Sequence, residues 1–324
     1  MKSPLKFGLL LAFTALPAAA ATYIGPAVGD WNTPGNWDSN TVPATATGES
    51  AVISNGATVD YPATALGDLN ANGGGSITVS GGSRLKTDQT NWSQINNGTM
   101  ILNNGTFSRT AAGNFVGSQI AGVLGSPTTS VITATNSLIE VNAAATSGNL
   151  ILGFTDFTTS TLSLVDSSIV VGGEVWLGSN TNNDANQIST LNIYNSSITT
   201  KGAVGLWVWD YAAAGNTMRI NFSGPAGSSI NVSDSIGIRA DAIGANNAAT
   251  WESLWDLGIL TAEGQSGLTG AQFSSHFVTA GTNIRDGAVP LPYSLTYVPE
   301  ASTSLLTLLT GGLLLGRRRR HAHS

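Results

Sequence analysis

Ser160-Thr161-Leu162-Ser163-Leu164 recurs 29 residues later as Ser189-Thr190-Leu191-Asn192-Ile193. In both stretches the apolar residues stand two apart, the spacing that places side chains on one face of a β-strand. The polar turn that follows recurs too, since Asp166-Ser167-Ser168 corresponds to Asn195-Ser196-Ser197. A segment repeated at such a period predicts a unit that buries its apolar face by stacking on its own copies.

The repeat extends in both directions along the chain. The same frame aligns Ile169 with Ile198, and it predicts that Val175 and Leu177 pair with Val204 and Leu206. Further copies show the same alternation of apolar and turn residues: an earlier one at Ile132, Ala134, Asn136, Ser137, Ile139, Val141, Leu150 and Leu152, a later one at Ile220, Phe222, Ile230, Val232, Ile236 and Ile238, and fainter ones at 100–105 and 53–56.

Each copy holds three short strands separated by Asn, Ser or Gly. Three strands in about 30 residues are typical of a parallel β-helix, and parallel crossovers are overwhelmingly right-handed. We therefore expect an all-β, right-handed parallel β-helix of six or seven coils over residues 22–247. A β-sandwich is the alternative, but it offers no reason for every third strand to repeat in register.

The two ends of such a solenoid need caps, because open strand edges aggregate. Residues 30–37, with Trp31 and Trp37, and Val42-Pro43 are expected to form the N-terminal cap. Trp251, Leu254, Trp255 and Leu257 follow a helical spacing, which predicts a short C-terminal helix with Thr250 as N-cap and Gly258 as its end. Residues 248–297 are thus assigned to a C-terminal cap followed by a tether or last strand.

The N-terminal 21 residues have the pattern of a secretory signal peptide. Lys2 and Lys6 precede an apolar run from Phe7 to Leu16, and Ala19-Ala20-Ala21 provides small residues for cleavage. The chain from 22 to 300 carries seven basic residues and all 19 acidic ones, so its net charge is −12. That sign argues against a nucleic-acid partner. The chain has no cysteine, so disulfides do not contribute to its stability.

The C-terminus combines a short motif, an apolar segment and an arginine cluster. Val298-Pro299-Glu300-Ala301 precedes the apolar segment Leu305–Leu315, and Arg317, Arg318, Arg319 and Arg320 follow it. As one helix, residues 301–316 would be about 24 Å long, slightly short of the roughly 30 Å bilayer core. The arginines would remain cytoplasmic. A plain membrane anchor is the alternative interpretation.

Residues 298–324 resemble the PEP-CTERM sorting signal of Gram-negative bacteria. Val298, Pro299, Glu300 and the four arginines match the family pattern, whereas Ala301 replaces its second proline. The resemblance implies an exosortase-type membrane enzyme as partner, an inner-membrane intermediate, and final placement at the cell surface or in the extracellular matrix. It also implies an association with exopolysaccharide and biofilm. The start of the repeat region resembles autotransporter-like β-helical passengers.

Parallel β-helices also serve as scaffolds for polysaccharide lyases and glycoside hydrolases, so an enzyme is the competing expectation. Glycosidases need two carboxylates roughly 5–10 Å apart. Here the acids of the repeats fall singly, and the corner equivalents of Asp166 are Asn136 and Asn195. We therefore expect no catalytic residues and a non-catalytic role.

The sequence also predicts no cofactor and no metal site. His276 is the only histidine before the tail and there is no cysteine, which disfavours zinc. Asp68-Leu69-Asn70-Ala71-Asn72-Gly73 begins like a calcium loop, but Val79 stands at its twelfth position instead of Glu. An Asn/Gly turn is the preferred interpretation of that segment.

Four aromatic residues are candidates for binding a glycan. If Val175, Leu177 and Val208 face inward, Trp176, Trp207 and Trp209 face outward, with Tyr211 close by. Outward tryptophans need a loop or a ligand to cover them, and sugar rings stack on such surfaces. The sequence predicts a platform for extracellular polysaccharide at these residues, with packing under a surface loop as the alternative.

Overall fold

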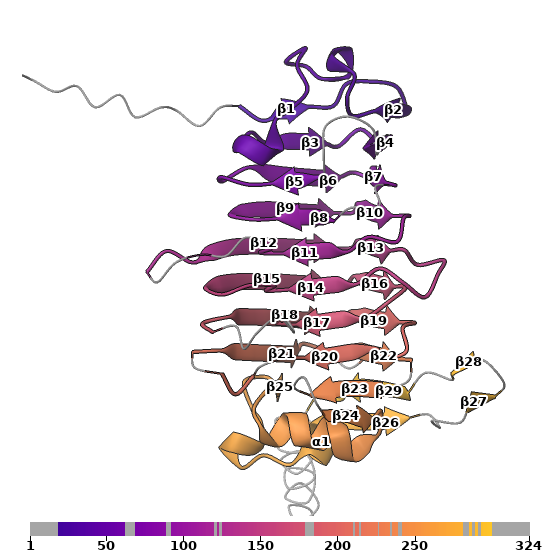
Figure 1. The fold of residues 1–324 in the computed structure, drawn as a ribbon. Helices are drawn as coiled ribbons and strands as arrows, with labels where there is room; N and C mark the ends of the chain where they lie inside the picture. The colour runs from indigo at the N-terminus through magenta and orange to yellow at the C-terminus, as the bar shows by residue number, and fades with distance from the viewer. Residues whose placement is uncertain are drawn as a thin grey trace, which may run out of the picture.

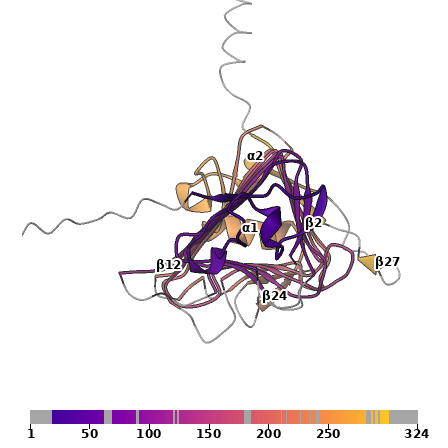
Figure 2. The same cartoon turned by 90° about the horizontal axis from the view of Figure 1, so that it is seen from above.

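The computed structural model describes residues 19–61, 69–88, 92–119, 122, 125–178, 185–209, 211–213, 215–225, 227–233, 235–238, 242–280, 285–286, 289–290 and 293–299. These residues form a β-solenoid, in which seven consecutive sets of three strands stack as coils (Figure 1). Viewed along its axis, the stack has a roughly triangular outline (Figure 2). The predicted all-β parallel solenoid is therefore confirmed.

Three sheets form the sides of the solenoid. The first sheet contains, in spatial order, β1 (Ala21–Thr22), β3 (Ala51–Ile53), β6 (Ser76–Ser80), β9 (Gly98–Asn103), β12 (Thr128–Thr135), β15 (Thr158–Val165), β18 (Ile188–Tyr194), β21 (Thr217–Ser223) and β25 (Leu260–Ala262). All its strand pairs are parallel.

The second sheet begins in the same way and ends differently. It contains β2 (Val28–Asp30), β4 (Thr58–Tyr61), β7 (Arg84–Thr87), β10 (Thr106–Arg109), β13 (Leu138–Val141), β16 (Ser168–Val171), β19 (Ser197–Thr200), β22 (Ser229–Val232), β29 (Tyr293–Tyr297) and β26 (Phe277–Ala280). The last two pairs, β22 with β29 and β29 with β26, are antiparallel.

The third sheet contains β5 (Asn70–Ala71), β8 (Ser93–Ile95), β11 (Phe115–Gly117), β14 (Leu150–Leu152), β17 (Val175–Leu177), β20 (Leu206–Val208), β23 (Ser235–Ile238) and β24 (Ala242–Ala245). Outside the three sheets, β27 (Arg285–Asp286) and β28 (Val289–Pro290) form a small hairpin. The described helices are η1 (Pro34–Asn36), η2 (Thr45–Thr47), α1 (Ala248–Asp256), η3 (Gly267–Thr269) and α2 (Phe273–His276).

The core is a set of columns in which equivalent inward residues of successive coils pair directly. Leu162 is paired with Leu191 and Ile169 with Ile198, and all four side chains are buried. Each such apolar side chain contributes about 1.5–3 kcal/mol when it leaves water. The column of Leu162 and Leu191 continues with Ile77, Met100, Ile132, Ile220 and Leu260.

The predicted frame is wrong in one place. Val175 pairs with Leu206 rather than Val204, and Leu177 pairs with Val208 rather than Leu206. The cause is turn length, because residues 172–174 connect β16 to β17 whereas residues 201–205 connect β19 to β20. The two extra residues shift the third strand by two positions, so alternation is kept while the partners change.

A ladder of serine hydroxyls stabilises the corner between the first and second sheets. Ser167 Oγ accepts a hydrogen bond from the Ser137 amide at 3.1 Å and donates to the Val165 carbonyl at 2.7 Å. The Ser167 amide in turn donates to Ser196 Oγ at 2.9 Å. Thus the serine hydroxyl at each corner accepts a hydrogen bond from a buried amide of the preceding coil. Alternation of apolar residues alone would leave that amide without a partner.

Both ends of the stack are covered. Trp31 and Trp37 are buried at the N-terminal end with ring centroids 4.7 Å apart, and Trp37 Nε1 donates to the Trp31 carbonyl at 2.8 Å. At the other end, α1 lies beneath the last coils (Figure 1).

The N-cap of α1 differs from the prediction. It is Asn247, whose side chain accepts a hydrogen bond from the Thr250 amide at 3.0 Å, and not Thr250. Gly258 follows the helix with φ +69°, as expected of a residue that ends it. Trp251, Leu254 and Trp255 are buried, whereas Leu257 is exposed.

The expected signal peptide (1–21) and sorting segment (298–324) fall mostly outside the described residues. In the described part of the chain, no helix has the length and apolar character needed to cross a membrane.

Candidate functional site

Three of the four predicted aromatic residues lie together on the outer face of the third sheet. Trp176 of β17 and Trp207 of β20 are register partners, and Trp209 follows two positions later. The rings of Trp207 and Trp209 are stacked, with centroids 4.1 Å apart and planes 10° apart. Trp176 meets Trp209 edge-on at 5.7 Å. We call Trp176, Trp207, Trp209 and Glu174 the tryptophan cluster.

Glu174 connects the cluster through hydrogen bonds. Trp176 Nε1 donates to Glu174 Oε2 at 2.6 Å, and the Trp207 side chain and the Val204 backbone also donate to this carboxylate. Burial raises the pKa of the Glu174 carboxyl above its ordinary value of 4.5, and these hydrogen bonds reduce the rise without cancelling it. The net rise means that the loss of water outweighs the donated hydrogen bonds.

The four aromatic residues of the predicted glycan platform differ in their solvent exposure. Trp207 is 8% exposed and Trp209 6%, so little of either ring reaches solvent. One reason is Gly237 of the next coil, which leaves the space that Trp207 fills: a Cβ at Gly237 would lie 1.8 Å from Trp207 Cε3. Trp176 is half-buried, and Tyr211 is half-buried against the core. The surfaces available for a sugar are therefore those of Trp176 and Tyr211.

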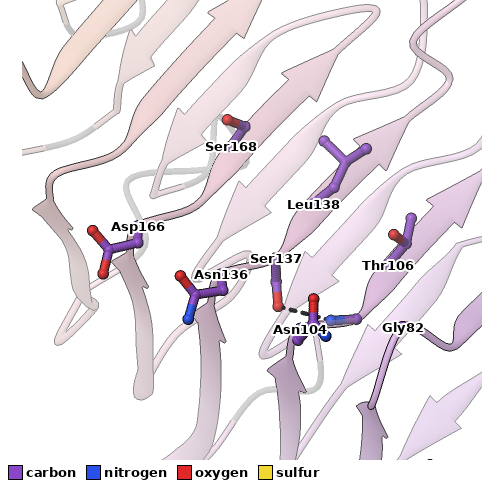
Figure 3. Close-up of a pocket in the computed structure, with 9 residues that line it drawn as sticks. Gly82, Asn104, Thr106, Asn136, Ser137, Leu138, Asp166 and Ser168 are labelled. Carbon is purple, nitrogen blue, oxygen red and sulfur yellow. Dashed lines mark hydrogen bonds between the residues drawn. The ribbon is translucent and has the colours of Figure 1, made fainter.

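A second feature is a shallow groove of about 540 Å³ along the corner between the first and second sheets. Asn104, Asn136 and Asp166 stand at successive corners along it (Figure 3). Their φ values of 52°, 48° and 50° are left-handed, the conformation that Asn and Asp adopt more readily than other side-chain-bearing residues. The groove is polar, and Asp166 accepts a hydrogen bond from Asn195 Nδ2 at 2.5 Å. These residues form turns that are hydrogen-bonded along the stack: Asp166 through its carboxylate, and Asn104 and Asn136 through their backbone amides, which donate to carbonyls of the next coil.

Two further carboxylates in the described part of the repeats are also engaged separately. Glu140 pairs with Arg84 at 2.7 Å across one intervening coil, and Asp156 accepts a hydrogen bond from the Ala185 amide at 2.5 Å. Among the described residues, no group of three or more His, Asp or Glu side chains is placed to hold a metal ion. Asp68, the first residue of the calcium-like loop, lies outside the described part.

His276 is buried in the C-terminal cap. Its ring lies 5.2 Å from that of Trp255, and only 2% of the residue is exposed. The His276 carbonyl accepts a hydrogen bond from the Val298 amide at 2.8 Å.

This bond places the start of the predicted sorting motif against the folded body. Val298 is 38% exposed and Pro299 is half-buried, directly after β29. Glu300 and Arg317 to Arg320 lie outside the described residues.

Sequence reasoning missed one buried charge. Arg109 is 1% exposed and occupies an inward position of β10. Its Nε donates to the Gly113 carbonyl at 2.6 Å and its Nη1 to Ser93 Oγ at 2.7 Å. The sequence did contain a signal for this buried charge, because Arg109 is in register with Val141, an inward residue of the next coil.

No protein-family model, no curated protein and no solved structure matches this chain.

Proposed function

We propose that this chain is an exported, non-catalytic protein sorted by an exosortase-type membrane enzyme and held at the surface or in the extracellular matrix of a Gram-negative bacterium. Its body would be a right-handed solenoid rod associated with exopolysaccharide. A membrane-inserted intermediate would precede processing, with residues 298–324 as the sorting segment and residues 1–21 as the signal peptide. Glycan contact at Trp176 and Tyr211, the two predicted residues that keep exposed surface, belongs to this proposal.

The observation that carries the proposal is the C-terminal pattern: Val298, Pro299 and Glu300, then an apolar segment, then four arginines. Its position supports this reading, because the motif begins one residue after the last strand of the folded body. A sorting enzyme would thus act at the boundary between a rigid domain and its tail.

The distribution of acids supports a non-catalytic role over the alternative of a carbohydrate-active enzyme. Glu140, Asp156, Asp166 and Glu174 each bond to a different partner among the described residues. An inverting or retaining glycosidase requires two carboxylates facing one bond.

The test is to delete residues 298–324 and compare the protein in surface, matrix and medium fractions. We expect the deleted chain to leave the surface and matrix fractions. A chain of full length with serine at 317–320 controls for the loss of mass, and it should fail in the same way because the arginine cluster is part of the signal. An unchanged distribution of both variants would contradict the sorting assignment.

A further inference from the structure

A groove of about 550 Å³ lies where the outer face of the first sheet meets the C-terminal cap. Strands β18, β21 and β25 form its floor, and η3 with its flanking residues forms one wall. Its volume is in the range of sites that hold small ligands or a few units of a polymer. It is separate from the tryptophan cluster, which lies on the third sheet.

Arg219 is the one charged residue among those described in the groove lining. Its side chain is exposed on β21. Two ion pairs join described residues, Arg84 with Glu140 and Lys86 with Asp60, and Arg219 belongs to neither. Arg109 and Lys201 also lie outside these two ion pairs, but both donate hydrogen bonds to carbonyl oxygens of the chain, whereas Arg219 lies in the groove lining. The groove therefore favours an anionic ligand.

The remaining lining alternates hydroxyl and amide groups with apolar edges. Asn221 Oδ1 accepts a hydrogen bond from Thr261 Oγ1 at 2.8 Å, which orients the amide nitrogen of Asn221 as a donor. Leu268 of η3 is 75% exposed and Ile188 of β18 is 40% exposed. This combination matches a uronic acid. The polar groups can bind the sugar hydroxyls, the apolar edges can contact the C–H faces of the ring, and the one cation can pair with the carboxylate.

We infer that this groove binds a uronate-containing segment of an acidic polysaccharide, with Arg219 pairing the carboxylate. A guanidinium forms two parallel hydrogen bonds to a carboxylate, which fixes the orientation of the sugar ring. Strands about 4.8 Å apart along the floor present rows of polar groups parallel to the solenoid axis. This inference deepens the proposed function, because it names the kind of glycan that the surface protein contacts.

The test uses the exported chain and short oligogalacturonates, with the same oligosaccharides methyl-esterified as a neutral probe. Arg219→Gln should weaken oligogalacturonate binding about tenfold or more, the effect of losing one charge-assisted interaction. Lys86→Gln removes one positive charge from the second sheet and should leave binding unchanged. Arg219→Lys keeps the charge without the paired geometry and should bind with intermediate affinity. Circular dichroism and thermal melting confirm that each exposed substitution leaves the fold intact.

Three results would overturn the inference: equal binding by Arg219→Gln and wild type, equal losses in Arg219→Gln and Lys86→Gln, or tighter binding of the methyl-esterified probe. Failure here is distinguishable from failure of the proposed function. If residues 298–324 still determine the surface fraction while oligogalacturonate does not bind, only the groove assignment fails. If oligogalacturonate binds but the tail has no effect on distribution, the sorting proposal fails and the groove assignment stands.

Discussion

Glu174 shows how one residue acquires its properties from neighbours that are distant in sequence. It lies in a turn, yet its carboxylate receives hydrogen bonds from Trp176 of its own coil and Trp207 of the next. Hydrogen bonds to a carboxylate favour its charged form, and removal of water disfavours it. Since the pKa is raised overall, burial has the larger effect.

This balance predicts a dependence of stability on pH. Because the pKa of Glu174 is higher in the folded than in the unfolded chain, its contribution is complete below 4.5 and is lost as the pH rises through the folded-state pKa. Glu174→Gln cannot ionise and should avoid this loss. The free energy of unfolding of Glu174→Gln, relative to that of wild type, should therefore be larger at about pH 7 than below pH 4.5.

Urea unfolding followed by tryptophan fluorescence across this pH range measures the difference. Glu252→Gln, which changes an exposed carboxylate on α1, is the control and should follow the wild-type profile. A difference between Glu174→Gln and wild type that is the same at every pH would contradict the assignment.

Arg109 shows the limit of reading single residues. Alternation places position 109 inward, where an aliphatic residue is expected, and the arginine does face inward. What makes this tolerable is the Gly113 carbonyl and the Ser93 hydroxyl, which accept its hydrogen bonds. A buried charge without such acceptors would cost several kcal/mol.

At the scale of elements, the corner between the first and second sheets is held by a repeated serine. Ser137, Ser167 and Ser196 are buried at successive coils, and each accepts a hydrogen bond from an amide of the preceding coil. The equivalence of Asp166-Ser167-Ser168 and Asn195-Ser196-Ser197, predicted from the sequence, is confirmed by the corner pairing. The second residue of each triplet is thus a structural requirement of the solenoid.

We predict that Ser167→Ala destabilises the fold by about 1–3 kcal/mol, because the buried Ser137 amide loses its acceptor. The adjacent Ser168→Ala is a matched control. The Ser168 hydroxyl is exposed and contacts only Ser197 Oγ at 3.2 Å, so its loss should change stability by about 0.5 kcal/mol or less. Chemical denaturation of the two variants gives both values, and equal effects would show that the ladder contributes nothing.

The turns decide how elements align. Residues 201–205 form a longer turn than residues 172–174, and this brings Trp207 rather than Gly205 beside Trp176.

The N-cap of α1 differs from the prediction because of local backbone geometry. Asn247 precedes the helix with extended φ and ψ, so its side chain reaches the Thr250 amide, whereas Thr250 already lies inside the first turn.

At the scale of the whole molecule, the caps must pair or cover the strand edges at the two ends of the stack. β29 pairs antiparallel with β22 and β26, so the last residues before the sorting motif form a strand of the second sheet that lies between these two. Leu295 and Tyr297 are fully buried there. Of the two alternatives expected for the end of this segment, a tether or a last strand, residues 293–297 form the strand.

A chain that ends at Pro292 should aggregate, whereas a chain that ends at Pro299 should remain dispersed. The shorter chain leaves the edge of β22 unpaired and exposes apolar surface around it. Light scattering during incubation at constant protein concentration compares the two. If both chains remain equally dispersed, β29 does not protect the edge.

The repeat itself, Leu162 with Leu191 and Ile169 with Ile198, determined the parallel solenoid, because alternation at two residues and recurrence at 29 leave stacking as the way to bury every copy. Only the tertiary structure decided which residues meet where turns differ in length or where distant segments converge: the stacked and buried Trp207 and Trp209, the bonds to Glu174, the groove beside Arg219, and the antiparallel β29. The repeat period predicts contacts between equivalent positions of successive coils. The contacts just named join positions that are not equivalent in the repeat, so the period does not predict them.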